Sequence, residues 1–293
     1  MTPVRDIQDE YGIIGREREL TTALAVLGSG RHLLLEGPVG VGKTTVALAV
    51  CAHLGRPTVR VDGDDRYSES KLTGWFDPPL VLSRGYGPES FFPGPLVQAM
   101  RDGAVLFINE LNRMPESVQN VLLPALDERI VSVPHIGVVH AADGFQVVAT
   151  QNPVEYVATG HLSEALRDRF EHLALGYQDA EEEAAIVRRE TGCGDDGLVG
   201  LAVRLTRATR RHPRFRKGAS VRAAVAIVAV AARLEGDDVL RRAMDAALAT
   251  RVELRDDIDI DMASALDELY DQVVVRGEDV EAAGGDDGAG PKA

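Results

Sequence analysis

Cysteine and aromatic residues are scarce in this chain of 293 residues. The two cysteines, Cys51 and Cys193, cannot form a disulfide framework, and neither lies in a CxxC pair or near a histidine at metal-ligand spacing. The seven histidines are scattered and form no HExxH motif, and no GxSxG motif is present. The sequence therefore argues against a disulfide scaffold, a zinc enzyme and an esterase, and its cysteine usage favours the reducing cytoplasm.

Basic residues are outnumbered and long apolar runs are missing. Lys and Arg number 32 against 46 Asp and Glu, a formal net charge of −14, which excludes a generally basic protein that coats DNA. The longest apolar run, residues 223–232, is too short to cross a bilayer, and the N-terminal segment lacks the basic start and apolar run of a secretory signal. We expect a cytoplasmic protein without a membrane span.

What the sequence contains is an alternation of short β-branched runs with helical stretches through its first 175 residues. Such alternation is typical of an α/β fold, a parallel sheet covered by helices on both faces. After residue 178 the sequence becomes rich in Ala, Arg and Glu and shows no strand pattern, which predicts an all-α domain. We expect an α/β domain over 1–177, a helical domain over 178–275 and a disordered acidic tail over 276–293. The expected strands are 32–35, 58–61, 105–108, 146–149 and, less clearly, 172–175.

The most specific motif follows the first expected strand. Residues 37–44 read GPVGVGKT, which fits GxxxxGK[ST] in full, and a helical stretch comes next. Glycines let backbone N–H groups curl around phosphate oxygens, Lys43 adds a charge, and Thr44 can hold Mg²⁺ through its hydroxyl. The alternative is a glycine-rich turn that merely joins strand to helix. We expect ATP with Mg²⁺ at this loop, held by Gly37, Pro38, Val39, Gly40, Val41, Gly42, Lys43, Thr44 and Thr45.

A second expected strand ends in Asn109-Glu110. P-loop enzymes usually carry an Asp for Mg²⁺ at the first position and a Glu that polarises the attacking water at the second. Glu110 is therefore the expected catalytic residue, and Asn109 the expected metal-site residue. Because Asn109 is neutral, it should support Mg²⁺ less well than a carboxylate, and hydrolysis should be slow. The alternative for Glu110 is a solvated acid at a strand end.

A third polar position, Asn152, follows the strand FQVVAT at the sheet edge where ligands collect in open α/β folds. We expect its amide to sense the attacking water or the γ-phosphate. The alternative is that Asn152 only caps the turn before Pro153.

Four segments occur in this order along the chain: GPVGVGKT, VLFINELNRMPESVQNVLLPALDER, VVATQNPVEY and SEALRDRF. In these segments the chain resembles the MoxR family of AAA+ ATPases and, more distantly, the ATPase subunit of magnesium chelatase. The resemblance covers residues 14–235. It implies a five-stranded parallel sheet with a helical lid, assembled as a homo-oligomeric ring, usually of six subunits, with ATP at each interface.

The same resemblance assigns roles to single residues. Ile14 and Gly15, with Arg16, match the segment that touches adenine. Glu110 matches the catalytic Glu and Asn152 the first sensor. Arg169 lies where relatives carry the arginine that reaches into a neighbour's site; the alternative is a surface arginine paired with Asp168. In KGASVRAA, Arg222 matches the lid arginine that senses nucleotide in cis, with Ser220 as N-cap.

Three other segments leave alternatives open. From Arg204 to Arg222 there are eight basic residues and no acid, which could form a nucleic-acid patch, a solvated helix face, or a phosphate and subunit contact. Residues 75–92 hold five of the fourteen aromatics and match an insertion of the relatives, either a partner-contact surface or a local core. Residues 129–140 alternate around a turn and predict a β-hairpin, either structural or a moving lever.

The resemblance implies an ATP-driven remodelling or maturation factor, chaperone-like, that acts on a protein client, often with a partner carrying a von Willebrand factor A domain and sometimes in metal delivery. Asn109 motivates an alternative, a nucleotide-gated scaffold that hydrolyses little. A magnesium-chelatase-type subunit is the third possibility.

Overall fold

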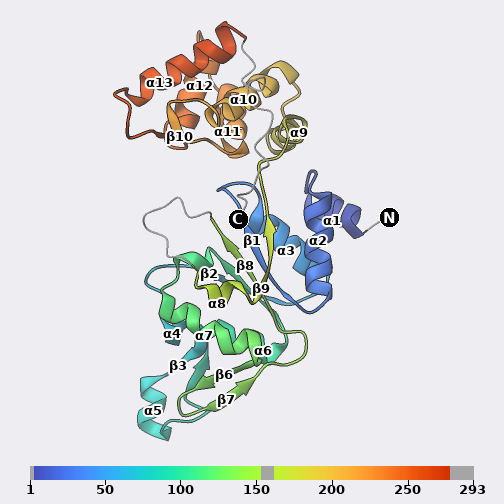
Figure 1. Ribbon diagram of the computed structural model, residues 1–293, viewed down its shortest axis with the longest axis vertical. Coiled ribbons are helices and arrows are strands. Elements are labelled where there is room, and N and C mark those ends of the chain that lie inside the picture. Colours follow the sequence, from blue (N-terminus) through green and yellow to red (C-terminus); the bar gives the residue numbers. More distant parts are fainter. Residues whose placement is uncertain (1–2, 153–161, 278–293) are drawn as a thin grey trace, which may run out of the picture. The chain divides into compact units, whose positions relative to one another are not determined.

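The computed structural model of the protein describes residues 3–152 and 162–277 (Figure 1). The chain divides into two compact units, Met1–Gly176 and Tyr177–Ala293. Most of the tail expected to be disordered lies outside the described residues, as does Pro153. No helix among the described segments is long and apolar enough to cross a membrane.

The first unit is built on a five-stranded sheet, as predicted. Its strand order is β2 (Thr58–Asp62), β5 (Val105–Asn109), β8 (Gln146–Gln151), β1 (His32–Glu36) and β9 (Phe170–Ala174), and all neighbours are parallel. In parallel pairing, the carboxyl ends of the strands meet at one edge, and this edge carries the loops after β1, β2, β5 and β8.

Helices cover both faces of this sheet (Figure 1). Successive strand side chains alternate between faces, so Leu33 and Leu35 enter one core whereas Leu34 enters the other. The first core is closed by α1 (Pro3–Tyr11), α2 (Glu17–Gly28) and α3 (Lys43–His53). The second is closed by α6 (Pro95–Asp102) and α7 (Glu116–Asp127). A 3₁₀ turn (Leu111–Arg113) and α8 (Glu164–Arg167) complete the connections.

The aromatic segment forms a projecting tip (Figure 1). It follows α4 (Glu69–Thr73) and contains β3 (Gly74–Phe76), α5 (Pro78–Arg84) and β4 (Phe91–Pro93), and β3 pairs antiparallel with β4. The expected hairpin is present as β6 (Ile130–Val133) and β7 (Gly137–His140). Tyr86 stacks on His135 at 4.4 Å between ring centroids, so the insertion contacts the hairpin.

The second unit has its own core, formed by α9 (Ala180–Thr191), α10 (Asp196–Thr209), α11 (Val221–Ala231), α12 (Val239–Leu248), α13 (Met262–Tyr270) and a π-helical turn (Asp271–Val275). In addition to the expected helices, it contains a short antiparallel pair, β10 (Phe215–Lys217) with β11 (Glu253–Leu254). Strands of two and three residues are too short to show an alternating pattern, so they could not be predicted from the sequence.

Candidate nucleotide-binding site

The glycine-rich loop connects β1 to α3 in the geometry of an anion site. Gly40 and Gly42 have φ values of 82° and 93°, which place them in the left-handed region that glycine favours. Gly37 packs so closely on the end of β9 that a Cβ there would lie 2.1 Å from the carbonyl oxygen of Leu175. A glycine-rich loop that runs into the first turn of a helix is a place where a phosphate is favoured, because its free N–H groups and the helix dipole both attract an anion.

Lys43, the first residue of α3, is buried and faces back into this loop. Its Nζ donates to the carbonyl oxygens of Gly37 and Pro38 at 2.6 and 2.8 Å and to Oδ1 of Asn152 at 2.9 Å. Asn152 also donates through Nδ2 to Oε1 of Glu110 at 3.4 Å. The three residues expected to act on the γ-phosphate and the attacking water therefore form one chain of contacts.

Glu110 follows β5 in an unusual backbone conformation. Its φ is 56°, uncommon for a residue with a side chain, and its N–H donates to Oγ1 of Thr150 at 2.9 Å. Arg113 donates to Oε2 at 2.8 Å while Asn152 contacts Oε1, so both carboxylate oxygens are oriented. A carboxylate so held next to the loop can act as a general base toward a water molecule.

The two residues expected to serve Mg²⁺ are in contact. Thr44 donates through Oγ1 to Oδ1 of Asn109 at 3.1 Å, and Thr150 donates to the same oxygen at 3.0 Å. Hydroxyl and amide oxygens are acceptable Mg²⁺ ligands, so the donor set fits. No group of three or more His, Cys, Asp or Glu that could hold a metal occurs in the described part of the chain. A Mg²⁺ ion here would therefore complete its coordination with water or phosphate oxygens.

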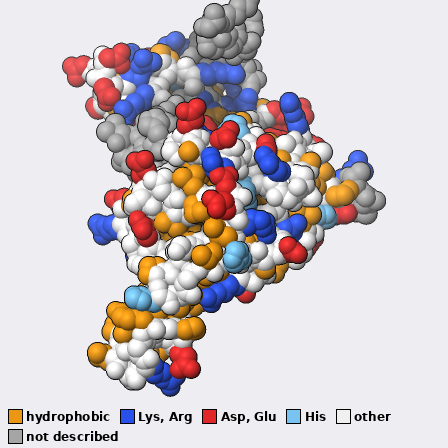
Figure 2. Space-filling model, turned by 60° about the horizontal axis from the view of Figure 1, so that its bottom comes forward, with side chains coloured by type: hydrophobic (Ala, Val, Ile, Leu, Met, Phe, Trp, Pro, Cys, Tyr) orange, Lys and Arg blue, Asp and Glu red, His pale blue; other side chains and the backbone are white. Residues whose placement is uncertain are grey.

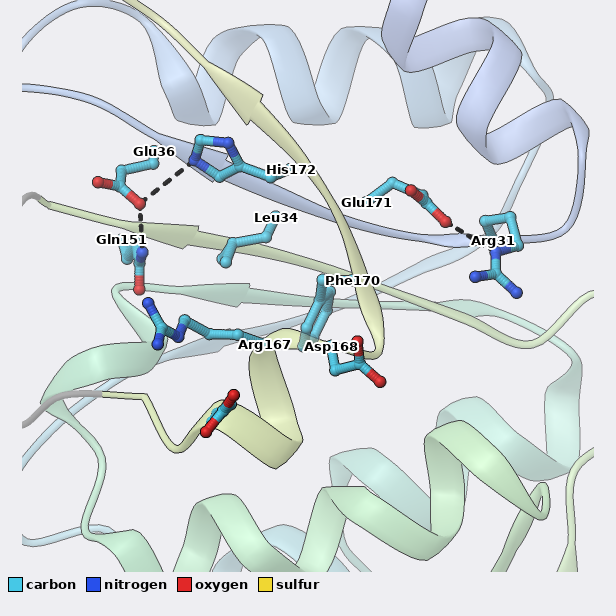
Figure 3. Close-up of a pocket in the computed structure, with 10 residues that line it drawn as sticks. Arg31, Leu34, Glu36, Gln151, Arg167, Asp168, Phe170, Glu171 and His172 are labelled. Carbon is cyan, nitrogen blue, oxygen red and sulfur yellow. Dashed lines mark hydrogen bonds and ion pairs between the residues drawn. The ribbon is translucent and has the colours of Figure 1, made fainter. Parts of the chain in front are cut away.

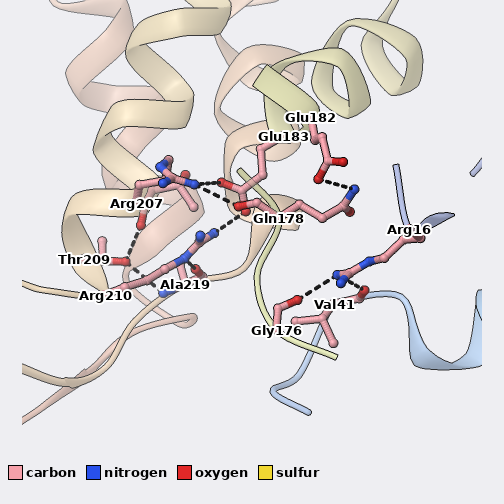
Figure 4. Close-up of polar contacts among 11 residues, drawn as sticks. Arg16, Val41, Gly176, Gln178, Glu182, Glu183, Arg207, Thr209, Arg210 and Ala219 are labelled. Atoms are coloured by element: carbon pink, nitrogen blue, oxygen red, sulfur yellow. Dashed lines mark hydrogen bonds and ion pairs between the residues drawn. The ribbon is translucent and has the colours of Figure 1, made fainter. Parts of the chain in front are cut away.

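Residues of the expected adenine segment lie beside the loop (Figure 4). Arg16, with a φ of 66°, donates through one terminal nitrogen to the carbonyl oxygens of Val41 and Gly176 at 3.0 and 2.7 Å. Gly15 accepts from the Gln8 side chain at 2.7 Å. Arg16 thus ties this segment to the phosphate loop and to the end of β9. Of the remaining expected residues, Ile14 is half-buried, and Val39 and Thr45 are exposed.

Arg169 makes a different ion pair from the one considered. It contacts Asp127 at the end of α7, with 2.5 Å between Nη2 and Oδ2, rather than Asp168. Its neighbour Arg167 extends toward Gln151 in a pocket of about 660 Å³ (Figure 3), where Gln151 and His172 both contact Glu36. The Arg167 guanidinium has no hydrogen bond or ion pair with any described residue.

In the second unit, Arg222 lies exposed in the first turn of α11, and its side chain has no ion pair within the described residues. Ser220 occupies the N-cap position, but its side chain makes no capping hydrogen bond.

Most other basic residues of the segment 204–222 form ion pairs within the second unit, which differs from all three alternatives for this segment. Arg207 and Arg210 both reach the buried carboxylate of Glu183, at 3.4 and 2.7 Å (Figure 4). Arg214, Arg216 and Lys217 pair with acids of the same unit, Glu253, Asp256 and Glu268.

Sequence reasoning missed three residues of the site. Thr150 and Arg113 hold Glu110, and Asp62, at the end of β2, accepts from Nδ2 of Asn109 at 3.0 Å. Asp62 could have been predicted from its position in the sequence, because it directly follows a predicted strand and therefore lies at the sheet edge where ligands bind.

Comparison with known proteins shows which family the chain belongs to. Residues 32–170 match the AAA domain of the dynein-related subfamily. Protein NorQ of Paracoccus denitrificans (strain Pd 1222) is 32% identical over 258 residues, covering 85% of this chain and 91% of NorQ. The gas vesicle ATPase GvpN of Ancylobacter aquaticus is 30% identical over 246 residues, covering 76% of this chain and 66% of GvpN.

Among solved structures, a RuvB variant from Thermotoga maritima matches with a TM-score of 0.54 at 21% identity, covering 80% of this chain and 71% of RuvB. That likeness concerns the fold alone. The sequence matches to relatives extend over most of this chain, and together with the P-loop fold they confirm the expected family: the protein belongs to the MoxR-like family of AAA+ ATPases.

Proposed function

We propose that this protein binds ATP with Mg²⁺ and hydrolyses the γ-phosphate, and that a cytoplasmic ring of its copies, six by resemblance, uses that cycle to remodel or mature a protein client. The observation that carries the proposal is the chain of contacts from Lys43 through Asn152 to Glu110, directly beside the phosphate loop. It brings a phosphate-binding cation, a sensing amide and a candidate base together.

In the proposed reaction, the loop N–H groups and Lys43 hold the phosphates, while Glu110 accepts the proton of the attacking water. Asn152, which contacts both Lys43 and Glu110, positions that water or the γ-phosphate between these two side chains. Thr44 and Asn109 would hold Mg²⁺, which when bound offsets negative charge on the phosphates. The ATPase named among the relatives, GvpN, supports assigning the same reaction class.

Hydrolysis would depend on ring assembly. Arg169 comes directly before β9, and its pair with Asp127 is partly exposed, with the two side chains 28% and 43% accessible. Such pairs contribute little to stability, so Arg169 can exchange Asp127 for a phosphate of a neighbouring copy. The exposed Arg222, in the second unit, is the candidate arginine that senses the nucleotide bound by its own copy.

The client surface we propose is the aromatic tip. Trp75 and Phe92 stack on each other yet remain 51% and 45% exposed, and Leu82 on α5 is 89% exposed. Figure 2 shows hydrophobic side chains gathered on this projecting end. Behind them, Phe76 packs against Phe91 and Tyr86, so the segment has both a local core and an exposed apolar face. Exposed apolar patches of this kind mark protein contacts.

The direct test is Mg²⁺-dependent phosphate release at a concentration at which the protein assembles. Wild type should exceed Lys43→Ala, and Glu110→Gln should bind ATP while losing turnover. No phosphate release above the Lys43→Ala background would end the motor proposal. Pull-down with Glu110→Gln in its ATP state then identifies the client and tests whether a von Willebrand factor A domain partner accompanies it.

Asn109 favours a second candidate function, a nucleotide-gated scaffold that assembles on ATP and hydrolyses little. Asn109→Asp separates the two: a large rise in turnover with unchanged ATP affinity supports the scaffold, and no rise argues against it. A magnesium-chelatase-type subunit is the third alternative, and metal insertion in the presence of partner subunits would be its readout.

A further inference from the structure

The carboxylate that the end of β5 lacks lies on the neighbouring strand. β2 and β5 are paired in parallel with Asp62 opposite Asn109, and residues paired in this way point to the same face of the sheet. Nδ2 of Asn109 donates to Oδ1 of Asp62 at 3.0 Å. Thr44, at the start of α3, is on that same face and contacts the other end of the Asn109 amide.

This arrangement fixes which way the Asn109 amide points. Its oxygen accepts from the hydroxyls of Thr44 and Thr150, and its nitrogen faces Asp62. A flipped amide would place the oxygen against the Asp62 carboxylate, which also has no proton to donate. Asp62 therefore orients the Asn109 oxygen toward Thr44, and its negative charge polarises the amide in the same direction.

Asp62 also pairs with Arg60, which donates to both of its oxygens, at 3.2 and 2.8 Å. The two side chains are 49% and 59% accessible. An ion pair that exposed is weak, so Arg60 does not compete strongly with a divalent cation for the carboxylate.

The close approach of the two strand ends depends on Gly63. Its N–H donates to the carbonyl oxygen of Asn109 at 2.7 Å, and a Cβ at this position would lie 2.1 Å from the carbonyl oxygen of Glu110. Any larger residue at 63 would push the Asp62 strand end away from Asn109.

We propose that Asp62 and Asn109 together replace the single carboxylate usual at this position: Asn109 presents the oxygen, and Asp62 supplies the negative charge that favours Mg²⁺ and holds that oxygen toward Thr44. The inference rests on the proposed binding of ATP with Mg²⁺ and deepens it. Asp62 is a positioning residue that acts through Asn109.

The test measures metal affinity rather than turnover. Mn²⁺ serves as the probe, and its dissociation from the complex of full-length protein with a non-hydrolysable ATP analogue is followed by electron paramagnetic resonance. Asp62→Asn keeps an acceptor oxygen and removes only the charge. Asp65→Asn makes the same change of charge at an exposed residue of the loop that follows β2 and is the matched control. Nucleotide affinity without metal shows that each variant is folded.

Asp62→Asn should weaken Mn²⁺ binding about tenfold, the loss typical for a residue that supports a metal ligand, with metal-free nucleotide affinity unchanged. Asp65→Asn should match wild type. Adding Asn109→Asp to Asp62→Asn should restore Mn²⁺ affinity, because the double variant carries the negative charge at position 109, on the neighbouring strand β5. Mn²⁺ affinity of Asp62→Asn within twofold of wild type overturns this inference but leaves the proposed function intact. Failure of wild type to bind nucleotide overturns both.

Discussion

The ammonium of Lys43 and the amide oxygen of Asn152 lie 2.9 Å apart, although 109 residues separate them in the sequence. Because Asn152 also contacts Glu110, it connects the lysine of the glycine-rich loop to the candidate base. Replacing Asn152 should therefore affect the chemical step more than nucleotide binding.

Asn152→Ala should lower kcat by about 100-fold, the usual loss when one preorganised hydrogen-bond donor is removed, while ATP affinity changes little. Steady-state phosphate release and equilibrium nucleotide binding measure the two effects. The matched control is Gln151→Ala, because the adjacent side chain contacts Glu36 instead. Equal losses in the two variants would contradict a role for Asn152 in the reaction.

Arg169 is predicted to act on a neighbouring copy. Lys43→Ala and Arg169→Ala should each be inactive, and an equimolar mixture should regain activity, because about a quarter of the interfaces in a random head-to-tail ring combine an intact loop with an intact arginine. Phosphate release from the mixture is the measurement. Mixing Lys43→Ala with Lys43→Ala/Arg169→Ala should regain nothing. If the first mixture is as inactive as the second, Arg169 does not act across an interface.

Glu183 is predicted to hold the second unit together. Its side chain is only 3% accessible and neutralises both Arg207 and Arg210, so Glu183→Ala should cost about 3–5 kcal/mol of unfolding free energy. The one tryptophan, Trp75, belongs to the first unit. The urea transition seen by far-ultraviolet circular dichroism should thus shift, and the tryptophan transition should not. Exposed Glu181→Ala on the same helix should leave both unchanged.

His32 is predicted to make the first unit sensitive to acid. Burial lowers its pKa from 6.5 to about 4, and its Nδ1 accepts the N–H of Val147 at 2.9 Å. Since the folded-state pKa is below the unfolded value, the contribution to stability is complete above pH 6.5 and is lost as pH falls toward 4. Between pH 7 and pH 5 the loss should be about 2 kcal/mol.

Urea unfolding followed by Trp75 fluorescence at both pH values measures this loss. His32→Gln should show a smaller difference between the two, whereas the exposed His140→Gln should behave like wild type. An unchanged difference in His32→Gln would assign the acid sensitivity to other groups.

The sequence predicted what local patterns and motif order determine. The five strands of the parallel sheet were located within two residues of their observed ends, because apolar runs and glycine-rich turns bound them. It did not predict that Asp62 faces Asn109, because that depends on the register of two strands 47 positions apart. For the same reason the alternative for Arg169, a pair with the adjacent Asp168, was wrong: its partner Asp127 lies at the end of α7, 42 positions earlier in the sequence.

The basic run illustrates the limit further. Within residues 204–222 no acid is present, so a local count indicates an unpaired positive surface. The fold brings Glu183, Glu253 and Glu268 to it from other elements. Charge balance depends on neighbours in space, and here the packing of α9, α10 and α13 together with the β10–β11 pair brings the acids to the basic residues.

The stack of Tyr86 on His135 has a practical consequence for engineering. It joins α5's segment to the β6–β7 hairpin, and Phe76 contacts the same histidine ring. The two projections are therefore one transplantable module, and a chimaera that exchanges only one of them between homologues would lose this aromatic packing. Grafting residues 74–93 together with 129–140 keeps both halves of the contact and gives the cleaner way to exchange this surface between homologues.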